Sequence, residues 1–271
     1  MTLANRRIVL TGGTGGLGQC VVTELLRRDA ELLVLSRSRS VYENRRIRHA
    51  AVDLSTAPGI ADAARLITKE EPDILINMAG VQHFGLVEHQ SIEAMQAGYM
   101  VNLVAPATLS RACLPFMKRR DAGQIANIGS ILGSLPFAHF TAYSSAKAGL
   151  RAFSEALRRE LAGTNITVTY VAPRAIRTGM LTSQIQEYAK RTGMSVDSPM
   201  SVAGKIVSAI AKQRKDVHIG FPERIFARLN GLWPRVVDAA VAVGDRKAAQ
   251  LFASQDFASY EGERSCAGDT P

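Results

Sequence analysis

The stretch Arg7-Ile8-Val9-Leu10-Thr11-Gly12-Gly13-Thr14-Gly15-Gly16-Leu17-Gly18 decides the fold of this 271-residue chain. Its apolar run predicts a strand that is covered on both faces, and a helical pattern follows the glycines. Glycine suits a tight turn at Gly12, close approach of a pyrophosphate at Gly16 and close helix–strand packing at Gly18. The N-terminus of the helix would offer N–H donors to phosphate. The alternative is a glycine-rich turn that binds nothing.

The same alternation of strand and helix continues along the chain. Strands are predicted at Arg7–Thr11, Glu31–Ser36, His49–Asp53, Asp73–Asn77, Gln124–Gly129, Ile166–Val171 and Val217–Gly220. Helices are predicted between them, among them Gly16–Arg28, Ile92–Lys118, Ala142–Leu161 and Ser201–Arg214. This order predicts the α/β class, as a single-domain Rossmann fold: a doubly wound, seven-stranded parallel sheet with helices on both faces. Ligands of such sheets bind outside the carboxyl ends of the strands.

The chain divides into one large domain and a short C-terminal part. We expect residues 1–220 to form the catalytic Rossmann domain, 221–260 a helical extension and 261–271 a loose tail. Within the domain, Thr178 to Pro199 has no strong period and is interpreted as a mobile lid.

Composition limits the class of protein. The net charge is +9, and the basic residues are spread along the chain without aromatic residues between them, so no nucleic-acid partner is expected. Cys20, Cys113 and Cys266 have neither disulfide nor metal spacing, so we predict reduced thiols, a cytoplasmic location and no metal. No signal peptide is recognised, and no uninterrupted apolar run reaches the roughly 18 residues of a membrane span.

The end of the second strand bears on the choice of dinucleotide. An acidic residue there would bind a ribose 2′-hydroxyl, but this chain has Ser36 followed by Arg37. The arginine fork suits a phosphate, which favours NADP(H) over NAD(H), unless Arg37 is only a solvated turn residue. At the next strand end, Asp53 would bind adenine or cap a helix. Asn77 would tie neighbouring strands together.

A second group of residues has acid–base chemistry. Tyr143 and Lys147 are spaced i, i+4 and lie on one helix face, and Ser130 follows the fifth strand. The ammonium and an oxidised nicotinamide would both favour the phenolate, so we expect a lowered pKa for Tyr143. Taken alone, the pair is more typical of a core tyrosine beside an exposed lysine. Its place after the glycine turn favours chemistry.

These motifs together resemble the short-chain dehydrogenase/reductase family, from about Arg7 to Gly220. The resemblance rests on Thr11 to Gly18, the segment Asn77 to Gly80, Asn102, Ser130, Tyr143 and Lys147, in that order. It implies an NAD(P)-dependent oxidoreductase with Tyr143 as general acid/base, Ser130 orienting the substrate, Lys147 holding the nicotinamide ribose and Asn102 anchoring a water. The implied cofactor-binding residues are Thr11, Gly12, Thr14, Gly16, Leu17, Gly18, Ser36, Arg37, Asp53, Leu54, Asn77, Ala79, Gly80, Tyr143, Lys147, Pro173, Ile176 and Thr178.

Two positions depart from the family pattern. Arg174 stands where a glycine is usual and Met78 where asparagine is frequent. Neither removes a catalytic group. Arg174 leaves the conformation of its loop in question and would place a positive charge near an acidic substrate.

The expected partners are a small-molecule carbonyl or alcohol and further copies of the chain. The resemblance implies a homodimer or homotetramer through the helices that carry Asn102 and Tyr143. Apolar residues recur at helical spacing from Phe221 to Val237, with arginines between them and Pro234 expected to divide the helix. This segment is either a membrane-surface helix or a helix packed on the domain or on a second subunit.

For function, we expect reduction of a ketone, 3-oxoacyl or otherwise lipophilic, or oxidation of the matching alcohol. The alternative is a non-catalytic NADP-binding sensor or regulator.

Overall fold

A seven-stranded parallel sheet organises the molecule. The computed structural model describes residues 1–38, 42–221 and 223–249. The strand order is β3-β2-β1-β4-β5-β6-β7, and every pair is parallel, so the predicted doubly wound Rossmann sheet is confirmed. The strands are β1 Arg7–Thr11, β2 Glu31–Ser36, β3 Ile47–Ala51, β4 Ile74–Asn77, β5 Gly123–Ile128, β6 Ile166–Pro173 and β7 Asp216–Ile219. Strand order reverses at β1, which lies between β2 and β4, and the crevice at this point opens toward the carboxyl ends.

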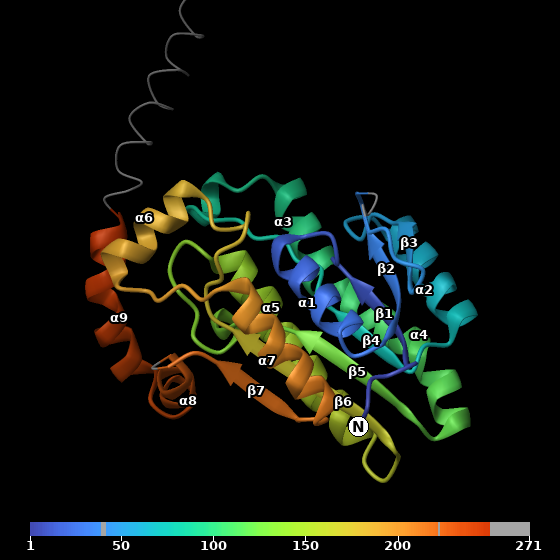
Figure 1. The fold of residues 1–271 in the computed structure, drawn as a ribbon. Coiled ribbons are helices and arrows are strands. Elements are labelled where there is room, and N and C mark those ends of the chain that lie inside the picture. The colour runs from blue at the N-terminus through green and yellow to red at the C-terminus, as the bar shows by residue number, and fades with distance from the viewer. Residues whose placement is uncertain (39–41, 222, 250–271) are drawn as a thin grey trace, which may run out of the picture.

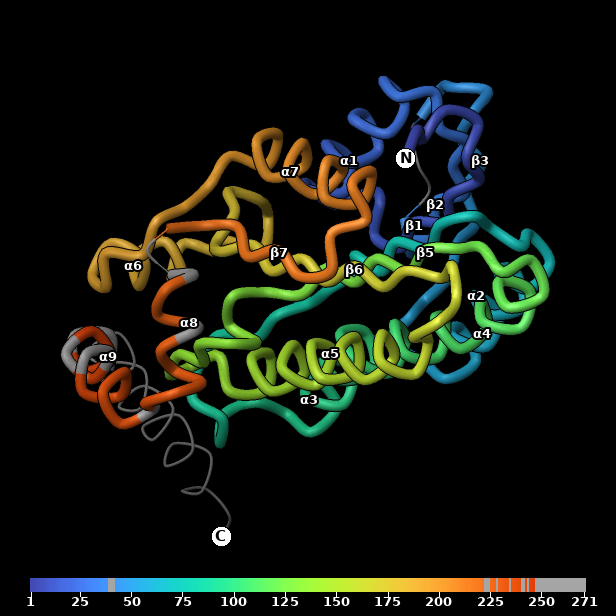
Figure 2. The backbone as a smooth tube through the Cα atoms, turned by 90° about the horizontal axis from the view of Figure 1, so that it is seen from below, coloured from blue at the N-terminus to red at the C-terminus, as the bar shows by residue number. Residues whose placement is uncertain are grey.

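Helices cover both faces of the sheet (Figures 1 and 2). Helices α1 Gly16–Leu26 and α7 Pro199–Ala211 lie on one face, and α2 Ala57–Glu70, α4 Ala105–Arg120 and α5 Thr141–Glu160 lie on the other. Successive strand residues pack into different cores: Leu10 and Val34 into the first, Val9 and Leu35 into the second. Because both faces are buried, the strands are apolar runs without alternation.

The third strand ends two residues earlier than predicted, at Ala51 rather than Asp53. The polar sequence that follows makes a turn instead of extending the ladder. Asp53 accepts hydrogen bonds from the Ser55 backbone N–H and hydroxyl at 3.0 and 2.7 Å, and Thr56 caps α2 by accepting from the Gly59 N–H. Asp53 therefore lies beyond the strand and is not the helix cap.

The predicted helix Ile92–Lys118 is three segments: α3 Ile92–Tyr99, the π-helical turn η2 Met100–Val104 and α4. Asn102 in η2 donates to the Gly98 carbonyl at 2.9 Å and to the Val81 carbonyl at 2.7 Å. A side chain that bonds to the backbone of its own helix and of a neighbouring loop favours the wider turn.

By length and composition, the run Ile92–Arg120 also meets the criteria for a membrane-spanning helix, and half of its most apolar window is buried inside the domain. The expectation that no apolar stretch is long enough to span a membrane is therefore not met, by length and composition. The run packs beside α2 and α5.

The segment from Thr178 to Pro199, for which no regular element was predicted, contains a helix, and its mobility stays a prediction. Helix α6 Ser183–Thr192 begins where Thr182 accepts from the Ile185 N–H and ends at Gly193, whose φ is 71°. A bridge between Ile176 and Asp197 ties the return of this segment to the end of β6.

Two helices follow β7, α8 Glu223–Leu232 and α9 Pro234–Ala249, and they divide at Pro234 as predicted. Ala227 and Val237 are buried against the short helix η3 Ile131–Gly133 and α6 in a third apolar cluster. This cluster closes the carboxyl end of the sheet, so the C-terminal helices belong to the wall of the site.

Candidate active site

The turn after β1 is built for close contact between backbones. Gly12 has φ 74°, and a Cβ there would lie 2.7 Å from the Ala79 Cα. A Cβ on Gly18 would meet the Gly12 carbonyl oxygen. The Thr11 hydroxyl accepts from the Met78 and Ala79 N–H groups, both at 3.0 Å, and joins the ends of β1 and β4. The predicted tight turn and helix packing are confirmed in geometry.

The same turn faces the segment after β6. A Cβ on Gly16 would lie 3.2 Å from the Thr178 Cβ, so a glycine lets the two segments approach closely. Gln19 donates to the Thr14 carbonyl at 3.0 Å and holds the first turn of α1, and Leu17 lines the cavity that begins here. A helix N-terminus whose first turn is free of side chains fits the binding of a pyrophosphate by backbone N–H groups.

Ser130, Tyr143 and Lys147 meet at the end of β5. Gly129 lets the chain pass Tyr170, whose ring a Cβ would strike, and Gly133 lets η3 pack on the backbone of α5 at Lys147. Ser130 caps η3 by accepting from the Leu132 N–H at 3.2 Å, and its hydroxyl lines the same cavity as Tyr143. The Lys147 ammonium lies 5.8 Å from the centroid of the Tyr143 ring. The two side chains share a helix face, as the spacing predicted.

Burial governs the ionisation of this group. Desolvation raises the pKa of Tyr143 to about 12, and the nearby Ser130 side chain partly offsets the rise. Desolvation also lowers the pKa of Lys147 to about 8. The expected lowering of the tyrosine pKa by its lysine therefore does not appear in the protein by itself. Both groups are removed from water in the same place, and this stabilises the neutral form of each relative to its charged form.

Lys147 and Asn102 approach each other across Gly80. The Lys147 ammonium donates to the Ile128 carbonyl at 3.1 Å, and Lys147 is 3% exposed. A Cβ on Gly80 would lie 3.2 Å from Asn102 Oδ1 and 3.7 Å from Lys147 Nζ. Both N–H groups of the Asn102 amide bind backbone carbonyls of Val81 and Gly98. The four predicted catalytic residues thus lie in one region, and their roles stay predictions.

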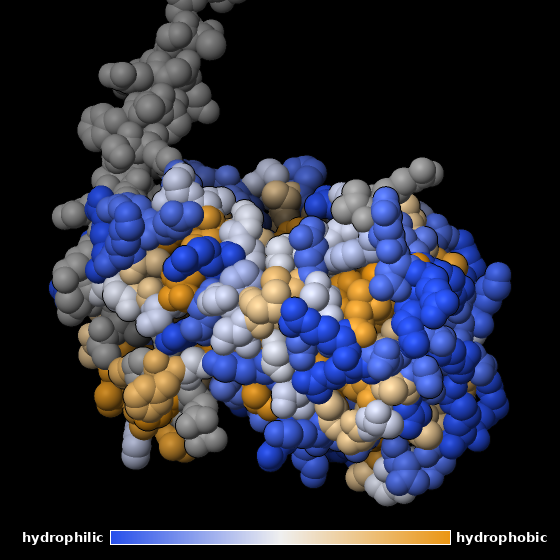
Figure 3. Space-filling model, in the orientation of Figure 1, coloured by the Kyte–Doolittle hydropathy of each residue, from blue (hydrophilic) through white to orange (hydrophobic). Residues whose placement is uncertain are grey.

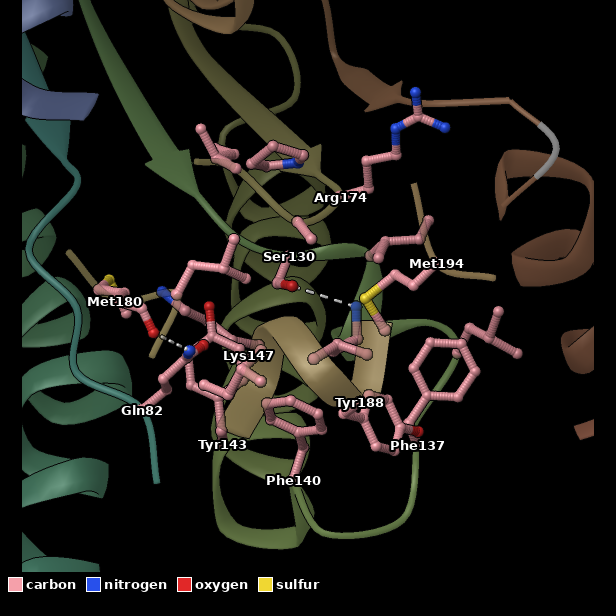
Figure 4. Close-up of a pocket in the computed structure, with 18 of the residues that line it drawn as sticks. Gln82, Ser130, Phe137, Phe140, Tyr143, Lys147, Arg174, Met180, Tyr188 and Met194 are labelled. Carbon is pink, nitrogen blue, oxygen red and sulfur yellow. Dashed lines mark hydrogen bonds between the residues drawn. The ribbon is translucent and has the colours of Figure 1, made fainter. Parts of the chain in front are cut away.

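A cavity of about 510 Å³ joins these residues to an apolar arm (Figure 4). Gly80, Ser130, Tyr143, Lys147 and Thr178 line its polar end. The arm is lined mainly by large apolar and aromatic side chains from four parts of the chain: Leu132, Leu135, Phe137, Phe140, Leu181, Ile185, Tyr188, Met194 and Phe226. The arrangement can hold a polar reacting group at one end and a lipophilic body at the other.

The segment after β6 borders the polar end. Pro173, Ile176 and Thr178 line the cavity, as their predicted place beside a nicotinamide requires. Arg174 does not add an open charge there. Its guanidinium points away from Ser130 and Tyr143 (Figure 4) and pairs with Asp197 through bonds of 3.0 and 2.8 Å. The expectation of a positive charge near an acidic substrate is therefore wrong, because the charge is neutralised by this pair.

The residues predicted for the adenine end lie outside the cavity, at the ends of β2 and β3. Ser36 is buried, Arg37 and Asp53 are exposed, and Leu54 is 6% exposed. Hydrogen bonds from Ser55 lower the pKa of Asp53, with a smaller effect of Arg37. Ser36 and Arg37 thus lie where a ribose 2′ substituent is expected.

Asn77 lies beneath the sheet ends rather than at a surface. Its amide nitrogen donates to Asn127 Oδ1 at 2.8 Å and to the Ser110 hydroxyl and the Pro106 carbonyl, both at 3.3 Å. This network joins β4, β5 and α4. The predicted tie between strands is confirmed, and a cofactor contact of Asn77 stays a prediction.

Sequence reasoning missed several residues around the site. Gln82 donates to the Met180 carbonyl at 2.7 Å across the cavity mouth, and the Tyr42 hydroxyl donates to the Gly13 carbonyl at 2.8 Å. Tyr188, on α6, is 1% exposed and packs against Phe84 and Phe140. The Thr182 cap and Gly193 were signals for α6, but no local pattern announces Gln82 or Tyr42.

The donor set fits a dinucleotide. The turn at Gly12 to Gly18 offers backbone N–H groups, Leu17 in that turn lines the cavity, and Lys147 borders the same cavity. A Cβ on Gly12, Gly13 or Gly18 would strike neighbouring protein atoms, so this turn must be free of side chains to pack as it does. Phosphate recognition by backbone N–H groups at a helix N-terminus needs this absence of side chains.

Comparison with known proteins agrees with this geometry. Residues 6–189 match the family described as short chain dehydrogenase. The ketoacyl reductase HetN of Nostoc sp. is 31% identical over 228 residues, 80% of this chain and 79% of that protein. The D-beta-hydroxybutyrate dehydrogenase of Cupriavidus necator is 28% identical over 206 residues, 72% of this chain and 80% of that protein.

Solved structures share the fold. A short chain dehydrogenase from Burkholderia cenocepacia in complex with NADP has a TM-score of 0.76 at 23% identity, covering 89% of this chain and 99% of that one. A 4-hydroxyisoleucine dehydrogenase complexed with NADH has a TM-score of 0.72 at 23% identity, covering 79% of this chain and 97% of that one.

Proposed function

This chain belongs to the short-chain dehydrogenase/reductase family and is an NAD(P)-dependent oxidoreductase of the CH–OH/C=O type, and from this premise we propose that it reduces a lipophilic ketone with NADPH or oxidises the matching alcohol. The observation that carries the proposal is the enclosure of Ser130, Tyr143 and Lys147 at the polar end of an apolar cavity. A sensor that only binds the dinucleotide does not need this group. Membership of an enzyme family favours catalysis.

Tyr143 is the general acid/base of the proposed reaction. A bound nicotinamide supplies or accepts the hydride. The neutral phenol is the stable form in the buried site, since burial raises its pKa to about 12, so the hydroxyl holds the proton that a reduced carbonyl oxygen needs. Ser130, which lines the same end of the cavity as Tyr143, orients the substrate oxygen beside the phenol.

Lys147 would hold the nicotinamide ribose and bring positive charge next to the phenol as the proton leaves. Its pKa of about 8 lies near neutrality, so it is also able to pass a proton onward. Asn102, next to Gly80 and to the lysine, is proposed to position the water at the start of that relay.

The preference for NADP(H) is supported by the neutral, buried Ser36 at the end of β2 and by Arg37 beside it. An acidic residue at this place would repel a 2′-phosphate, whereas a guanidinium binds it. NADP and NADH each accompany a structure with this fold, so the comparisons leave the preference to these residues.

A 3-oxoacyl or related lipophilic carbonyl is the proposed substrate class. The apolar arm beyond Ser130 suits a hydrocarbon body, and two relatives are named for a ketoacyl group and for β-hydroxybutyrate. Leu132 and Phe140, together with Tyr188 on α6, would set the length accepted.

The decisive experiment measures turnover with NADPH and NADH against ketones, acyl thioesters and sugars. Tyr143→Phe keeps the ring and removes the proton, so we expect kcat to fall by about 10²- to 10⁴-fold while NADPH binding is kept. Tyr99→Phe, which removes a hydroxyl that contacts Ser145 outside the cavity, is the matched control. An undiminished rate in Tyr143→Phe would remove the catalytic role.

We propose residues 1–220 as the catalytic domain and 221–260 as an extension that contacts an anionic membrane surface from the cytoplasmic side. Large apolar side chains of α8, α9 and the preceding turn remain exposed: Phe221, Ile225, Phe226, Leu232, Trp233 and Val236. They gather over α8, at the lower left of Figure 3. Exposed Arg235 lies among them, and a chain of net charge +9 is attracted to anionic lipids.

Phe226 belongs both to this surface and to the cavity wall, so a lipophilic substrate would have a short path inward. Sedimentation with vesicles of phosphatidylserine and phosphatidylcholine should recover the protein, and the double variant Leu232→Ser, Trp233→Ser should remain in solution. Ile92→Ser, at an exposed apolar residue of α3, should bind like the parent. A different result would be that the parent does not sediment with the vesicles but forms dimers, and that the double variant is monomeric. This result would show that the apolar surface binds a second copy of the chain instead of a membrane.

A homodimer or homotetramer through the helices bearing Asn102 and Tyr143 is also proposed. Light scattering of the purified chain measures this state directly.

A further inference from the structure

A short chain of hydrogen bonds links β3 to the turn after β2. His49 Nε2 lies 2.8 Å from the Ser36 hydroxyl, and that hydroxyl donates to the Ser38 carbonyl at 2.9 Å. A hydroxyl has one proton, and the one on Ser36 goes to Ser38. The tautomer that completes both bonds has the proton on His49 Nε2, whose N–H donates a hydrogen bond to the Ser36 hydroxyl.

The strand register explains why His49 reaches this place. Ser36 is paired with Ala51, and His49 lies two residues earlier on the same strand, so its side chain is on the same face of the sheet. Ser36 is 8% exposed, and a buried hydroxyl without its partner is costly. The imidazole thus braces the Ser36–Ser38 turn from the neighbouring strand.

That turn carries Arg37, the residue proposed to bind the 2′-phosphate. Its guanidinium is exposed and close enough to Asp53 to help lower the pKa of that carboxyl. An ionised Asp53 near the same place repels a phosphate. A small rotation of the turn therefore changes the balance between attraction by Arg37 and repulsion by Asp53.

We propose that His49 is a positioning residue for the selection of NADP(H) over NAD(H). It holds Ser36, and through Ser36 it fixes the turn that presents Arg37 to the 2′-phosphate. The affinity for a cofactor with a 2′-hydroxyl depends little on Arg37. We therefore expect this affinity to depend little on the hydrogen bond from His49 to Ser36. This inference rests on the proposed preference for NADP(H).

The test needs no substrate. Dissociation constants of NADPH and NADH are measured by cofactor fluorescence for the parent, His49→Leu and His49→Gln. Leucine removes the donor, so the NADPH constant should rise about fivefold to tenfold while the NADH constant stays within about twofold. Glutamine restores an N–H near the position of Nε2 and should bring the NADPH constant back to within about twofold of the parent.

Two further variants separate the outcomes. Arg48→Gln, at the neighbouring residue that pairs with Glu70 on the surface, should change neither constant. Arg37→Ala should weaken NADPH alone. Suppose that Arg37→Ala weakens NADPH binding alone. The role of His49 is then refuted if His49→Leu changes the two dissociation constants equally or not at all, or if His49→Gln does not restore the NADPH constant. In that case the cofactor preference stands. If Arg37→Ala leaves the ratio of the constants unchanged, the preference and the inference both fall.

Discussion

At the scale of single residues, Lys147 combines a catalytic position with a cost to stability. Its ammonium is enclosed, with the Ile128 carbonyl as hydrogen-bond acceptor and with its pKa lowered from 10.5 to about 8. The folded protein therefore holds this proton less firmly than the unfolded chain. Between about pH 8 and 10.5 the unfolded state binds more protons, so stability rises with pH, and below pH 8 the full cost remains.

Lys147→Met should therefore stabilise the protein while it abolishes activity. The removed desolvation cost is roughly 3 kcal/mol, and the lost hydrogen bond to Ile128 offsets about 1 kcal/mol of it. We expect the free energy of unfolding at pH 7, measured in urea, to rise by about 2 kcal/mol. The rise of stability above pH 8 should also be reduced. Lys205→Met, at an exposed lysine of α7, should change neither quantity. A loss of stability in Lys147→Met would contradict this account.

The chemistry of each residue was readable from the sequence, but its ionisation was not. The i, i+4 spacing of Tyr143 and Lys147 placed them on one helix face, and the structure confirms it. The sequence reading expected charge to lower the tyrosine pKa, whereas burial raises it to about 12. Desolvation depends on what surrounds a side chain, and η3, β5 and the loop at Gly80 reach this helix from distant parts of the chain.

At the scale of elements, the Arg174–Asp197 pair fixes the segment that carries α6. Both side chains are largely buried, 16% and 18% exposed. The Asp197 backbone also pairs with Ala175 and Arg177, at 2.8 and 3.0 Å. These bonds join the end of the segment Thr178 to Pro199 to the residues that follow β6, beside Thr178.

Asp197→Ala should therefore loosen the lid and leave the Arg174 guanidinium without its main partner. We expect the free energy of unfolding to fall by roughly 2 kcal/mol. We expect the KM for NADPH and for the carbonyl substrate to rise more than kcat falls, because Thr178 and Ile176 border the cavity. Glu70→Ala removes the exposed pair with Arg48 and should cost under about 1 kcal/mol. Equal losses in the free energy of unfolding for Asp197→Ala and Glu70→Ala would show that the buried pair stabilises the protein no more than the exposed pair.

Element boundaries followed the sequence where one pattern acted alone. The strands β1 and β2 have the predicted bounds, because apolar runs bounded by polar or glycine residues leave no alternative register. The boundary of β3 and the break at Asn102 were missed, since in both cases a polar side chain bonds to backbone and competes with the regular ladder. Helix α6 was missed because glycines and a proline around it suggested a loop, although Thr182 and Gly193 are ordinary caps.

At the scale of the whole molecule, the cofactor cleft joins elements from both halves of the sheet. The turn after β1 faces Thr178 after β6, and Gly80 after β4 faces Lys147 on α5. A dinucleotide bound across the cleft would therefore oppose unfolding of the whole domain.

NADPH at about 100 times its dissociation constant should add about 2.7 kcal/mol to stability, which corresponds to a rise in Tm of roughly 5–10 °C. NADH at the same concentration should raise Tm less, since Arg37 would add nothing to its binding. Differential scanning fluorimetry measures both shifts, with Arg37→Ala as control. Equal shifts for the two cofactors in the parent would contradict the proposed preference.

The sequence by itself determined the parallel sheet, the glycine turn and the identity of Ser130, Tyr143 and Lys147, because strand burial, backbone freedom and helical spacing are local properties. Only the tertiary structure decided that Arg174 is neutralised by Asp197, that Lys147 is buried, and that Tyr188 and Phe226 close the apolar arm. Each of these facts depends on segments that are distant along the chain and meet only when the helices pack on the sheet. Desolvation and cavity shape arise from that packing, so no local pattern specifies them.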